Sequence, residues 1–447
     1  MKTVLISAAA TALFAATQAS AQEQDNELAE IREQLQSLIQ RVDKLESEND
    51  VLKEENENLK AQDDYLKAET LGLRKESAVH AAEVSKVKGS DWAGRVALKG
   101  DLRYRHEQIS DDTLNSSGDL ATADRYRDRI RARINAEVKA TDSIDLGIGF
   151  ATSDGGDPRG SNATLDGVFS RKDIYLDTAY FDWQFASWGN LIGGKMKQPF
   201  FKPGQSLFWD SDVNPEGLAV GFGSGIYFGT AYNYWLDEVS GPESAVTSDA
   251  MMYGLQVGAK LPVGESSLTL AAHYYDLSAA QGRAPFYNNS ANGNTTINIP
   301  SGTSTVAVLA NDYQVINVGA EFNTMLSALP FQIWADVAQN QGADELDTAW
   351  SAGVLVGKAS NYRTWELGAA YQVLEKDALF AQLIDSDFGG GNSDADGFVF
   401  RAAYAPVRNW VLNATYFMTE RNADVANSVG QVGVDYDRFQ VDFNVKF

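Results

Sequence analysis

The stretch that decides the fold is DRYRDRIRARINAEVKA, residues 124–140. One set of alternate residues is basic: Arg125, Arg127, Arg129, Arg131 and Arg133. The other set becomes apolar: Ile130, Ala132, Ile134, Ala136 and Val138. A period of two predicts a β-strand with two unlike faces. Arginine on a lipid-facing position costs about 2–4 kcal/mol near the membrane midplane, and a packed core would need a partner for each. We therefore expect the arginines to face a water-filled lumen and the apolar face to meet lipid, rather than a solvated face on a soluble sheet.

Other segments repeat this division into a charged and an apolar face. In residues 96–107 the charged side chains that share a face are Lys99, Asp101, Arg103, Arg105 and Glu107, and they lie opposite Val96, Leu98 and Leu102. Lys195 and Lys197 alternate in the same way on the expected fifth strand. The chain ends on DRFQVDFNVKF, residues 437–447, in which Phe439, Val441, Phe443, Val445 and Phe447 alternate with polar residues. This pattern predicts a final strand with its apolar face in lipid, closing a barrel against the first strand.

The connections between these segments alternate in length. Short turns are expected at 141–143, 187–189, 223–225, 262–266 and 405–408. Long polar or glycine-rich loops are expected near 108–123, 154–172, 199–215, 238–248, 277–311, 340–347, 379–396 and 421–434. Eight long loops require sixteen strands, as in an outer-membrane barrel with tight turns on one side. The predicted fold is an all-β, antiparallel transmembrane β-barrel over 92–447, with fourteen or eighteen strands as the alternatives.

Composition excludes several other classes of protein. The 447 residues include no cysteine, which excludes disulfides, thiol chemistry and cysteine metal sites. The net charge of −24 argues against nucleic-acid binding. The histidines are only His80, His106 and His273, the last two on distant predicted strands, whereas a hydrolase needs a nucleophile, a base and an orienting group together. We expect no enzymatic activity, no cofactor and no metal site.

The first residues, MKTVLISAAATALFAATQASAQEQ, have the features of a secretory signal peptide. Lys2 supplies the basic start, residues 4–16 the apolar core and residues 19–21 the small-residue cleavage site. The apolar run is shorter than the roughly 20 residues of a membrane helix. We expect cleavage after residue 21, so that the mature chain begins at Gln22 and is exported.

A heptad repeat follows the signal peptide. Its core positions are Leu28, Ile31, Leu35, Leu38, Val42, Leu45, Asn49, Leu52, Asn56 and Leu59. Both asparagines fall at a positions, which fix helix register. The g-to-e pairs of a parallel assembly, such as Glu48 with Lys53 and Glu55 with Lys60, are opposite in sign. Residues 22–75 are therefore predicted to form a coiled-coil stalk that joins copies of the chain, and 76–91 a linker. The heptad does not separate two strands from three; we expect a homotrimer in preference to a dimer.

From about residue 92 onward the chain resembles the "putative porin" family of Gram-negative bacteria. The segments that carry the resemblance are GDLRYRHE (100–107), residues 124–158, IYLDTAYFDW (174–183), GGKMKQPFF (193–201), FWDSDVNPEGLAVGF (208–222) and IDSDFGGGNSDADG (384–397). The resemblance implies a pore-forming protein of the outer membrane, surrounded by lipid and lipopolysaccharide. The terminal pattern Phe443, Val445, Phe447 resembles the signal read by the outer-membrane assembly machinery. Similar stalks on other porins are thought to reach toward the cell wall, so the stalk is expected in the periplasm.

The third long loop is the candidate for narrowing the pore. In general porins this loop folds inward and faces acidic groups against a basic wall. Here residues 201–217 contain Lys202, Asp210, Asp212 and Glu216. Opposed charges across a constriction would orient dipolar solutes and set ion preference. The function expected is passive diffusion of small hydrophilic solutes or ions, with the ion preference open and leaning to anions. The alternatives are that the aspartates shape an external turn, or that the barrel is plugged and serves as an envelope tether or surface-binding protein.

Overall fold

The computed structural model divides into two units, residues 1–91 and 92–447. It describes residues 93–447 apart from 241–246 and 302–303, and scattered helical residues between 37 and 75. Among the latter, Leu45, Leu52 and Leu59 are helical and exposed. The signal peptide, the linker and the heptad positions Leu28, Ile31, Leu35, Leu38, Val42 and Asn49 lie outside the described residues, so the coiled coil stays a prediction. No helix among the described residues has the length and apolar character needed to cross a membrane.

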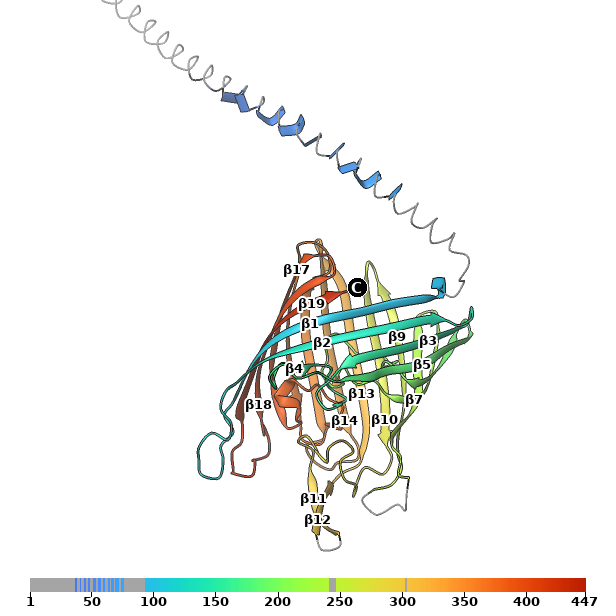
Figure 1. Ribbon diagram of the computed structural model, residues 1–447, viewed down its shortest axis with the longest axis vertical. Coiled ribbons are helices and arrows are strands. Elements are labelled where there is room, and N and C mark those ends of the chain that lie inside the picture. The colour runs from blue at the N-terminus through green and yellow to red at the C-terminus, as the bar shows by residue number, and fades with distance from the viewer. Residues whose placement is uncertain are drawn as a thin grey trace, which may run out of the picture. The chain divides into compact units, whose positions relative to one another are not determined.

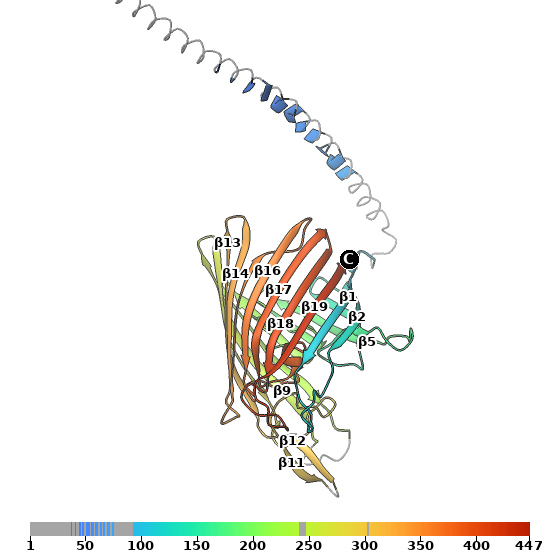
Figure 2. The same ribbon diagram turned by 90° about the vertical axis from the view of Figure 1, so that its left-hand side faces the viewer.

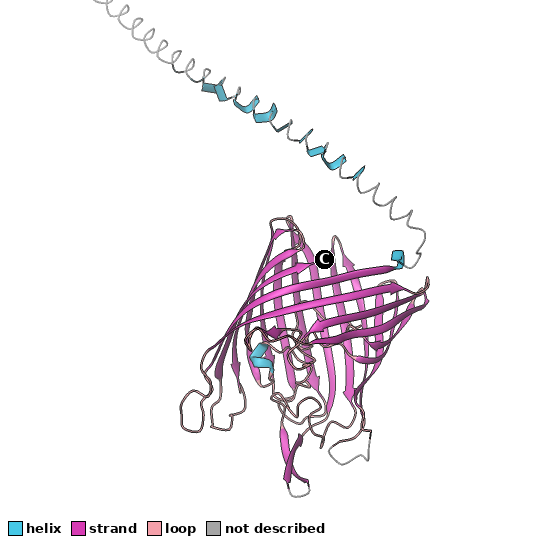
Figure 3. Ribbon diagram, in the orientation of Figure 1, coloured by secondary structure: helices cyan, strands magenta, loops and turns pink. Residues whose placement is uncertain are grey.

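Sixteen antiparallel strands form a closed barrel in the second unit (Figures 1 and 3). They are β1 (Val96–Asp111), β2 (Arg125–Lys139), β3 (Ile144–Thr152), β5 (Ile174–Ala186), β6 (Gly189–Lys195), β7 (Glu216–Ser224), β8 (Tyr227–Asp237), β9 (Ala250–Val263), β10 (Ser266–Leu277), β13 (Tyr313–Leu326), β14 (Leu329–Asn340), β15 (Thr348–Gly357), β16 (Thr364–Leu374), β17 (Ala395–Val407), β18 (Trp410–Arg421) and β19 (Val434–Lys446). The smaller elements are β4 (Ala163–Thr164), the hairpin β11 (Thr296–Ser301) with β12 (Ser304–Leu309), and the short helices η1 (Ala93–Arg95) and η2 (Phe388–Gly391).

The barrel closes where the first strand meets the last. β1 pairs with β19 from Asp101 opposite Lys446 to Asp111 opposite Tyr436, and β1 also pairs with β2. The backbones of Gly100 and Phe447 exchange two hydrogen bonds of 3.1 Å at the end of this seam. The sixteen-strand prediction and the closure of the last strand against the first are confirmed.

The long connections all leave the same end of the barrel, opposite the C-terminus (Figures 1 and 2). Loops 1 to 8 are residues 112–124, 153–173, 196–215, 238–249, 278–312, 341–347, 375–394 and 422–433. Each corresponds to an expected loop, and three of them begin more than two residues from the expected position. Loop 1 begins at 112 instead of 108, because β1 continues to Asp111. Loop 3 begins at 196 instead of 199, because β6 ends at Lys195, so Lys197 lies in the loop and not on a strand. Loop 7 begins at 375 instead of 379, because β16 ends at Leu374.

The two faces of the strands are as unlike as the sequence predicts. Apolar side chains such as Leu98, Ile134 and Phe443 are exposed on the outer face. Their neighbours on the inner face, including Arg105 and Asp442, are buried. An outer apolar band is what a bilayer requires of a transmembrane barrel, and the inner burial means that part of the lumen is filled by protein.

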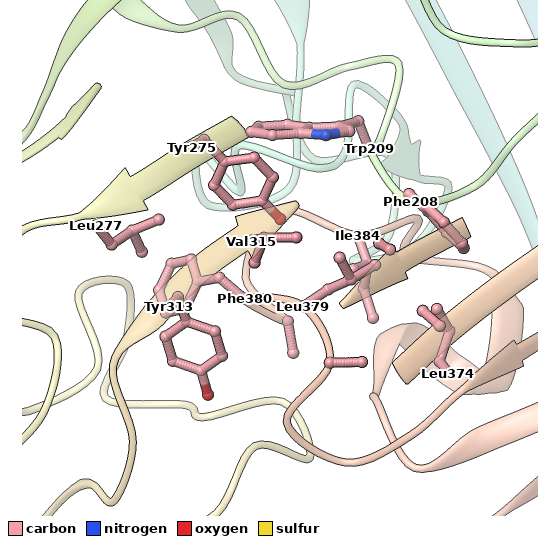
Figure 4. Packing of buried hydrophobic residues seen from close by; sticks show 14 of the residues in the cluster. Phe208, Trp209, Tyr275, Leu277, Tyr313, Val315, Leu374, Leu379, Phe380 and Ile384 are labelled. Carbon is pink, nitrogen blue, oxygen red and sulfur yellow. The ribbon is translucent and has the colours of Figure 1, made fainter. Parts of the chain in front are cut away.

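Part of that filling is an apolar cluster that the loops form inside the barrel (Figure 4). Loop 3 contributes Phe208 and Trp209, loop 7 contributes Phe380 and Ile384, and these pack against inward side chains of β10 and β13. The inward tyrosines of this side of the barrel, here called the aromatic wall, are Tyr232, Tyr234, Tyr275 and Tyr313. The inward residues of β1, β2 and β19 form the opposite type of surface, here called the charged wall. These two walls position the candidate site.

Candidate functional site

Most arginines of the charged wall are paired with carboxylates of the same wall. Arg131 Nη2 donates to Asp101 Oδ2 at 2.7 Å, and Arg133 Nε donates to Asp101 Oδ1 at 2.8 Å. Arg127 donates to Glu107, a carboxylate whose side chain has no exposed surface. The alternating pattern of β2 alone did not indicate that these arginines are paired with acidic side chains of the neighbouring strand. The acidic partners Asp101 and Glu107 flank Arg103 and Arg105 on the adjacent β1, so the charges of Arg127, Arg131 and Arg133 are largely neutralised.

Three further arginines of this wall are paired to different degrees. Arg105 donates to both oxygens of Asp442, at 2.6 and 2.9 Å. Arg129 Nη2 is 3.4 Å from Asp154 Oδ2 in loop 2. Arg125, at the loop end of β2, is exposed and makes no ion pair with any residue that the structure describes. Arg125 is therefore the ladder residue whose charge is least constrained by the protein.

Loop 3 lies inside the barrel and crosses its interior. The backbone N–H and C=O of Phe201 bond the side-chain amide of Gln256 on β9, at 2.7 and 2.8 Å. Gly204 N donates to Glu321 on β13 at 2.6 Å, and Ser206 Oγ donates to Asp336 on β14 at 2.6 Å. The loop thus follows the inner surface of the barrel from β9 to β14, bonded at each step to an inward side chain.

Aromatic stacking fixes the two ends of this crossing to the aromatic wall. The Phe200 ring lies 4.9 Å from that of His273, and the Trp209 ring lies 5.3 Å from that of Tyr275, centroid to centroid. His273 Nε2 is itself bonded to Tyr232 OH at 2.8 Å. Aromatic pairs at such distances contribute beyond the area that they bury. With both ends of the crossing held on the aromatic wall by these contacts, the tip of loop 3 points toward the charged wall.

The residues proposed for a constriction loop separate into two groups. Asp210 and Asp212 line a polar cavity inside the barrel, and Lys202 lies nearby with its Nζ donating to the Trp209 carbonyl at 3.2 Å. Burial lowers the pKa of Lys202, although the surrounding aspartates oppose this shift. Glu216 instead begins β7, largely exposed, with Lys195 Nζ 2.9 Å away.

The two remaining predicted lining lysines also lie away from the cavity. Lys197 is 3.5 Å from Asp177 at the loop end of the barrel. Lys99 is 2.6 Å from Glu137 near the other end. Both side chains are more than half exposed. The structure therefore brings Asp210 and Asp212 together with Arg103, Arg105 and Arg131, and leaves Glu216, Lys99, Lys195 and Lys197 outside that group.

Loop 7 is the part of the candidate site that the sequence analysis did not identify. Its backbone clamps loop 3, with Asp210 N donating to Leu383 O at 2.8 Å and Asp385 N donating to Leu207 O at 3.0 Å. Ser386 N donates to Asp210 Oδ2 at 3.0 Å. Asp387 accepts hydrogen bonds from Arg105, at 3.1 Å, and from Arg438. Loop 7 therefore connects loop 3 to the charged wall.

A repeated tripeptide marks the two loops that meet in this contact. Loop 3 contains Asp-Ser-Asp at 210–212, and loop 7 contains Asp-Ser-Asp at 385–387. Each forms the same turn, in which the first aspartate accepts from the N–H of the second, at 2.8 Å in loop 3 and 2.9 Å in loop 7. Such Asx turns are common where aspartate leads a loop. The two turns meet across the polar cavity.

The cavity between the two motifs has a volume of about 200 Å³. Its charged lining consists of the four aspartates of the two motifs and of Arg103, Arg105, Arg131, Arg159 and Arg401. Arg159 enters from loop 2, and its Nη1 donates to the carbonyls of Ala381 and Gly391 in loop 7, at 3.0 and 2.9 Å. Arginines on the wall thus face aspartates on the loops across one small space.

The two aspartates of each motif differ in their protonation. Burial and the neighbouring Asp385 and Asp212 raise the pKa of Asp210 well above its ordinary value. Burial and Asp387 likewise raise the pKa of Asp385. For Asp212 and Asp387 burial acts in the same direction, but adjacent arginines outweigh it and lower the pKa of both. In each motif the second aspartate is therefore anionic and the first holds a proton more readily.

Comparison with known proteins agrees with this architecture. A family model described as "putative porin" matches residues 119–327 and 301–447. The high-pH structure of Pseudomonas putida OprB aligns with a TM-score of 0.52 at 11% identity, over 79% of this chain and 95% of that one.

Two other similar structures have lower scores. One is OmpT of Vibrio cholerae, expressed in the outer membrane, with a TM-score of 0.44 at 12% identity over 79% of this chain and 97% of that one. The other is a triple mutant of the Rhodopseudomonas blastica porin. It has a TM-score of 0.42 at 11% identity, over 78% of this chain and 99% of that one. No curated protein sequence matches the chain.

Proposed function

Because the chain belongs to the "putative porin" family, we propose that it forms a water-filled channel in the outer membrane of a Gram-negative bacterium. Small hydrophilic solutes or ions would diffuse through it passively. The observation that carries the proposal is the polar cavity held inside a closed barrel whose outer face is apolar. Charged side chains deep in such a barrel are expected where water and solutes reach them.

Selectivity is proposed to arise where the two Asp-Ser-Asp motifs face the charged wall. The second aspartates are held anionic by arginines, whereas the first aspartates keep protons more readily. Arg103, Arg159 and Arg401 make no hydrogen bond to a carboxylate among the described residues. The net charge of the side chains at the constriction is therefore positive, in contrast to the negative net charge of the whole chain. This supports a preference for anions.

Single-channel recording in a planar bilayer tests this function. The full chain, inserted under a KCl gradient, should give a stable ohmic conductance and a reversal potential of the sign that indicates chloride preference. Arg401→Gln should move the reversal potential toward potassium. Arg125→Gln, which removes an equal charge outside the constriction, should move it less. A cation-selective wild-type channel would contradict the assignment of selectivity to the arginines.

The second candidate function is a plugged barrel that acts as an envelope tether or surface-binding protein. One observation favours it: loop 7 packs against both loop 3 and loop 5 inside the barrel. In loop 5, Asn294 Nδ2 donates to Leu379 O of loop 7 at 2.9 Å, and the rings of Phe286 and Phe380 lie 5.6 Å apart. A folded, inserted barrel that conducts no ions would favour this candidate over the channel.

The N-terminal region is proposed to be a periplasmic stalk that joins copies of the protein, three in preference to two, and contacts the cell wall. The heptad and its opposite-sign flanking pairs support this. Cleavage after residue 21 and assembly through the signal at Phe443, Val445 and Phe447 complete the proposal. Chemical cross-linking of the full chain in membranes tests it: Leu45→Asp together with Leu52→Asp should abolish cross-linked trimers. Trimers that survive both substitutions would place the self-association elsewhere.

A further inference from the structure

The cavity between the two Asp-Ser-Asp motifs contains arginines that donate no hydrogen bond to a carboxylate of the described residues. Arg105 and Arg131 bond carboxylates directly. Arg103 instead bonds the side-chain oxygen of Asn162, at 2.6 and 3.1 Å, and approaches the carboxylate of Asp442 only to 3.8 Å. Its charge is therefore matched only in part.

Arg401 is the cation with the fewest contacts in the cavity. Its guanidinium donates to the Gln205 side chain of loop 3. No carboxylate of the described residues lies within the 4.0 Å that defines an ion pair. Its side chain lines the cavity, so its remaining N–H groups are free to donate to a molecule there. A guanidinium in that state is a ready binding group for a carboxylate, which it can hold with two parallel hydrogen bonds.

The acidic side of the cavity has a matching free acceptor. Asp385 Oδ1 accepts from both the Asp387 and the Phe388 N–H groups, at 2.9 and 3.0 Å. Its Oδ2 has no hydrogen-bond partner among the described residues. No lysine or arginine of those residues lies within ion-pair distance of Asp385 or Asp210. The loops thus present a carboxyl oxygen to the same space into which Arg401 points.

Size and charge together limit what can occupy the cavity. A volume of about 200 Å³ is below the range of roughly 300–1,000 Å³ typical for drug-sized ligands. No three carboxylates or histidines of the described residues converge on a metal position. A simple anion would satisfy the arginines and leave the acceptor on Asp385 unmatched, and a simple cation would do the reverse. Unmatched buried polar groups are destabilising, so neither simple ion fits the whole cavity.

We propose that this cavity is a binding site for a small zwitterion, a compact α-amino acid, with its carboxylate toward Arg401 and Arg103 and its ammonium toward Asp385 Oδ2. The inference rests on the proposed channel function, because the solute must reach the constriction from outside. It extends that function from a diffusive pore to a channel with a saturable site for one class of solute.

The protonation of the empty cavity supports this assignment. Burial and Asp387 raise the pKa of Asp385, so in the empty cavity this carboxyl takes up a proton more readily, at the place that the ammonium would take. Binding of the zwitterion would release that proton to the solvent. Proton release on binding is therefore a second signature of the site, separate from any effect on ionic current.

Wild-type channels give the first test and require no substitution. Glycine, acetate and methylamine, the zwitterion and its two halves, are compared as blockers of single-channel current at neutral pH. Glycine should block at a concentration at least about tenfold lower than either half, which corresponds to one charge-assisted contact of about 1.4 kcal/mol. Equal block by acetate would overturn the proposal in favour of a plain anion site. Equal block by methylamine, or no block by any of the three, would also overturn it.

Three variants assign the contacts. Asp385→Asn keeps the oxygen that accepts from the two backbone N–H groups and removes the charge, so the advantage of glycine over acetate should disappear. Arg401→Gln should weaken block by both glycine and acetate. Arg125→Gln, at an exposed position outside the cavity, should change neither. A glycine advantage that survives Asp385→Asn would contradict the role of this aspartate.

Calorimetry separates failure of the site from failure of the channel. Glycine titrated into the full chain in detergent micelles, in two buffers of different ionisation enthalpy, should bind and release protons. If the barrel does not conduct but binds glycine with proton release, the channel proposal fails and the site stands. If it conducts but neither binds nor is blocked by glycine, the channel stands and the site is refuted.

Discussion

The aromatic wall and the charged wall of this barrel line the same lumen and have opposite relations to the loops. Tyr232, Tyr275 and Tyr313 on the aromatic wall are covered by loops 3, 5 and 7 and have almost no exposed surface. The charged wall pairs its side chains within itself and meets the loops across a polar cavity. Burying apolar surface stabilises the fold by about 25 cal/mol per Å², whereas burying an unpaired charge is destabilising. The chemistry of inward strand residues therefore determines where a loop is attached and where space for solutes is kept.

Breaking the aromatic attachment should have the largest effect. Trp209→Ala removes a ring packed between Phe200 and Tyr275 and should cost about 3–5 kcal/mol of the free energy of unfolding. Loop 3 should then leave the wall, and single-channel conductance should rise at least about twofold, following the widened cross-section. Trp350→Ala, at an outward position, is the control and should not change conductance. An unchanged conductance in Trp209→Ala would show that loop 3 is held by its hydrogen bonds instead.

Breaking a pair on the charged wall should act on stability more than on conductance. Arg127→Gln leaves Glu107, which has no exposed side-chain surface, without its cation. Removing one partner of a buried ion pair costs about 3 kcal/mol or more, measured as the shift in the midpoint of urea-induced unfolding. The double variant Arg127→Gln, Glu107→Gln should recover most of the loss. If the double variant is as unstable as the single one, the pair is not what stabilises this wall.

A smaller effect is expected at Gly204, where loop 3 touches the barrel wall. The residue has φ +50°, and a Cβ there would overlap the ring of Trp334. Gly204→Ala should push the loop tip inward at a cost of about 1–3 kcal/mol, with a lower conductance as the direct readout. Gly118→Ala is the matched control, because Gly118 also has a positive φ but no atom within 4 Å of the added Cβ. Equal behaviour of the two variants would assign the effect to backbone strain alone.

The smallest effect expected is the response to pH. Asp210 and Asp385 have raised pKa values in the folded protein, so their contribution to the contact between loops 3 and 7 is complete below their ordinary pKa near 4. It is lost as the pH rises through the raised values. Conductance should therefore increase modestly between acid and neutral pH as the loops loosen. Asp385→Asn should flatten this dependence, and a conductance that instead falls with rising pH would contradict the sign.

The sequence predicts most of the barrel but only part of the candidate site. Alternation in 124–140 predicts both faces of β2, and eight polar segments predict sixteen strands, because strand period and loop polarity are local properties. The pairing of Arg105 with Asp442 depends on register across the seam between β1 and β19, which no local pattern specifies. The second Asp-Ser-Asp motif is present in the sequence. Its meeting with the first depends on how loops 3 and 7 pack on the aromatic wall, so it could not be predicted.

The seam between β1 and β19 also constrains the order of assembly. Loop 7 is bonded to both loop 3 and loop 5 inside the barrel, whereas the wall is complete only when Phe447, directly after β19, reaches Gly100. Until then β1 has a free edge able to pair with other chains, and contacts between such distant parts of a chain form slowly. Loops that bind one another this tightly are most easily enclosed while the sheet is still open. The loops would then pack inside the barrel before β1 and β19 pair. Until that pairing, the free edge of β1 would need to be protected from other chains, for example by an assembly factor.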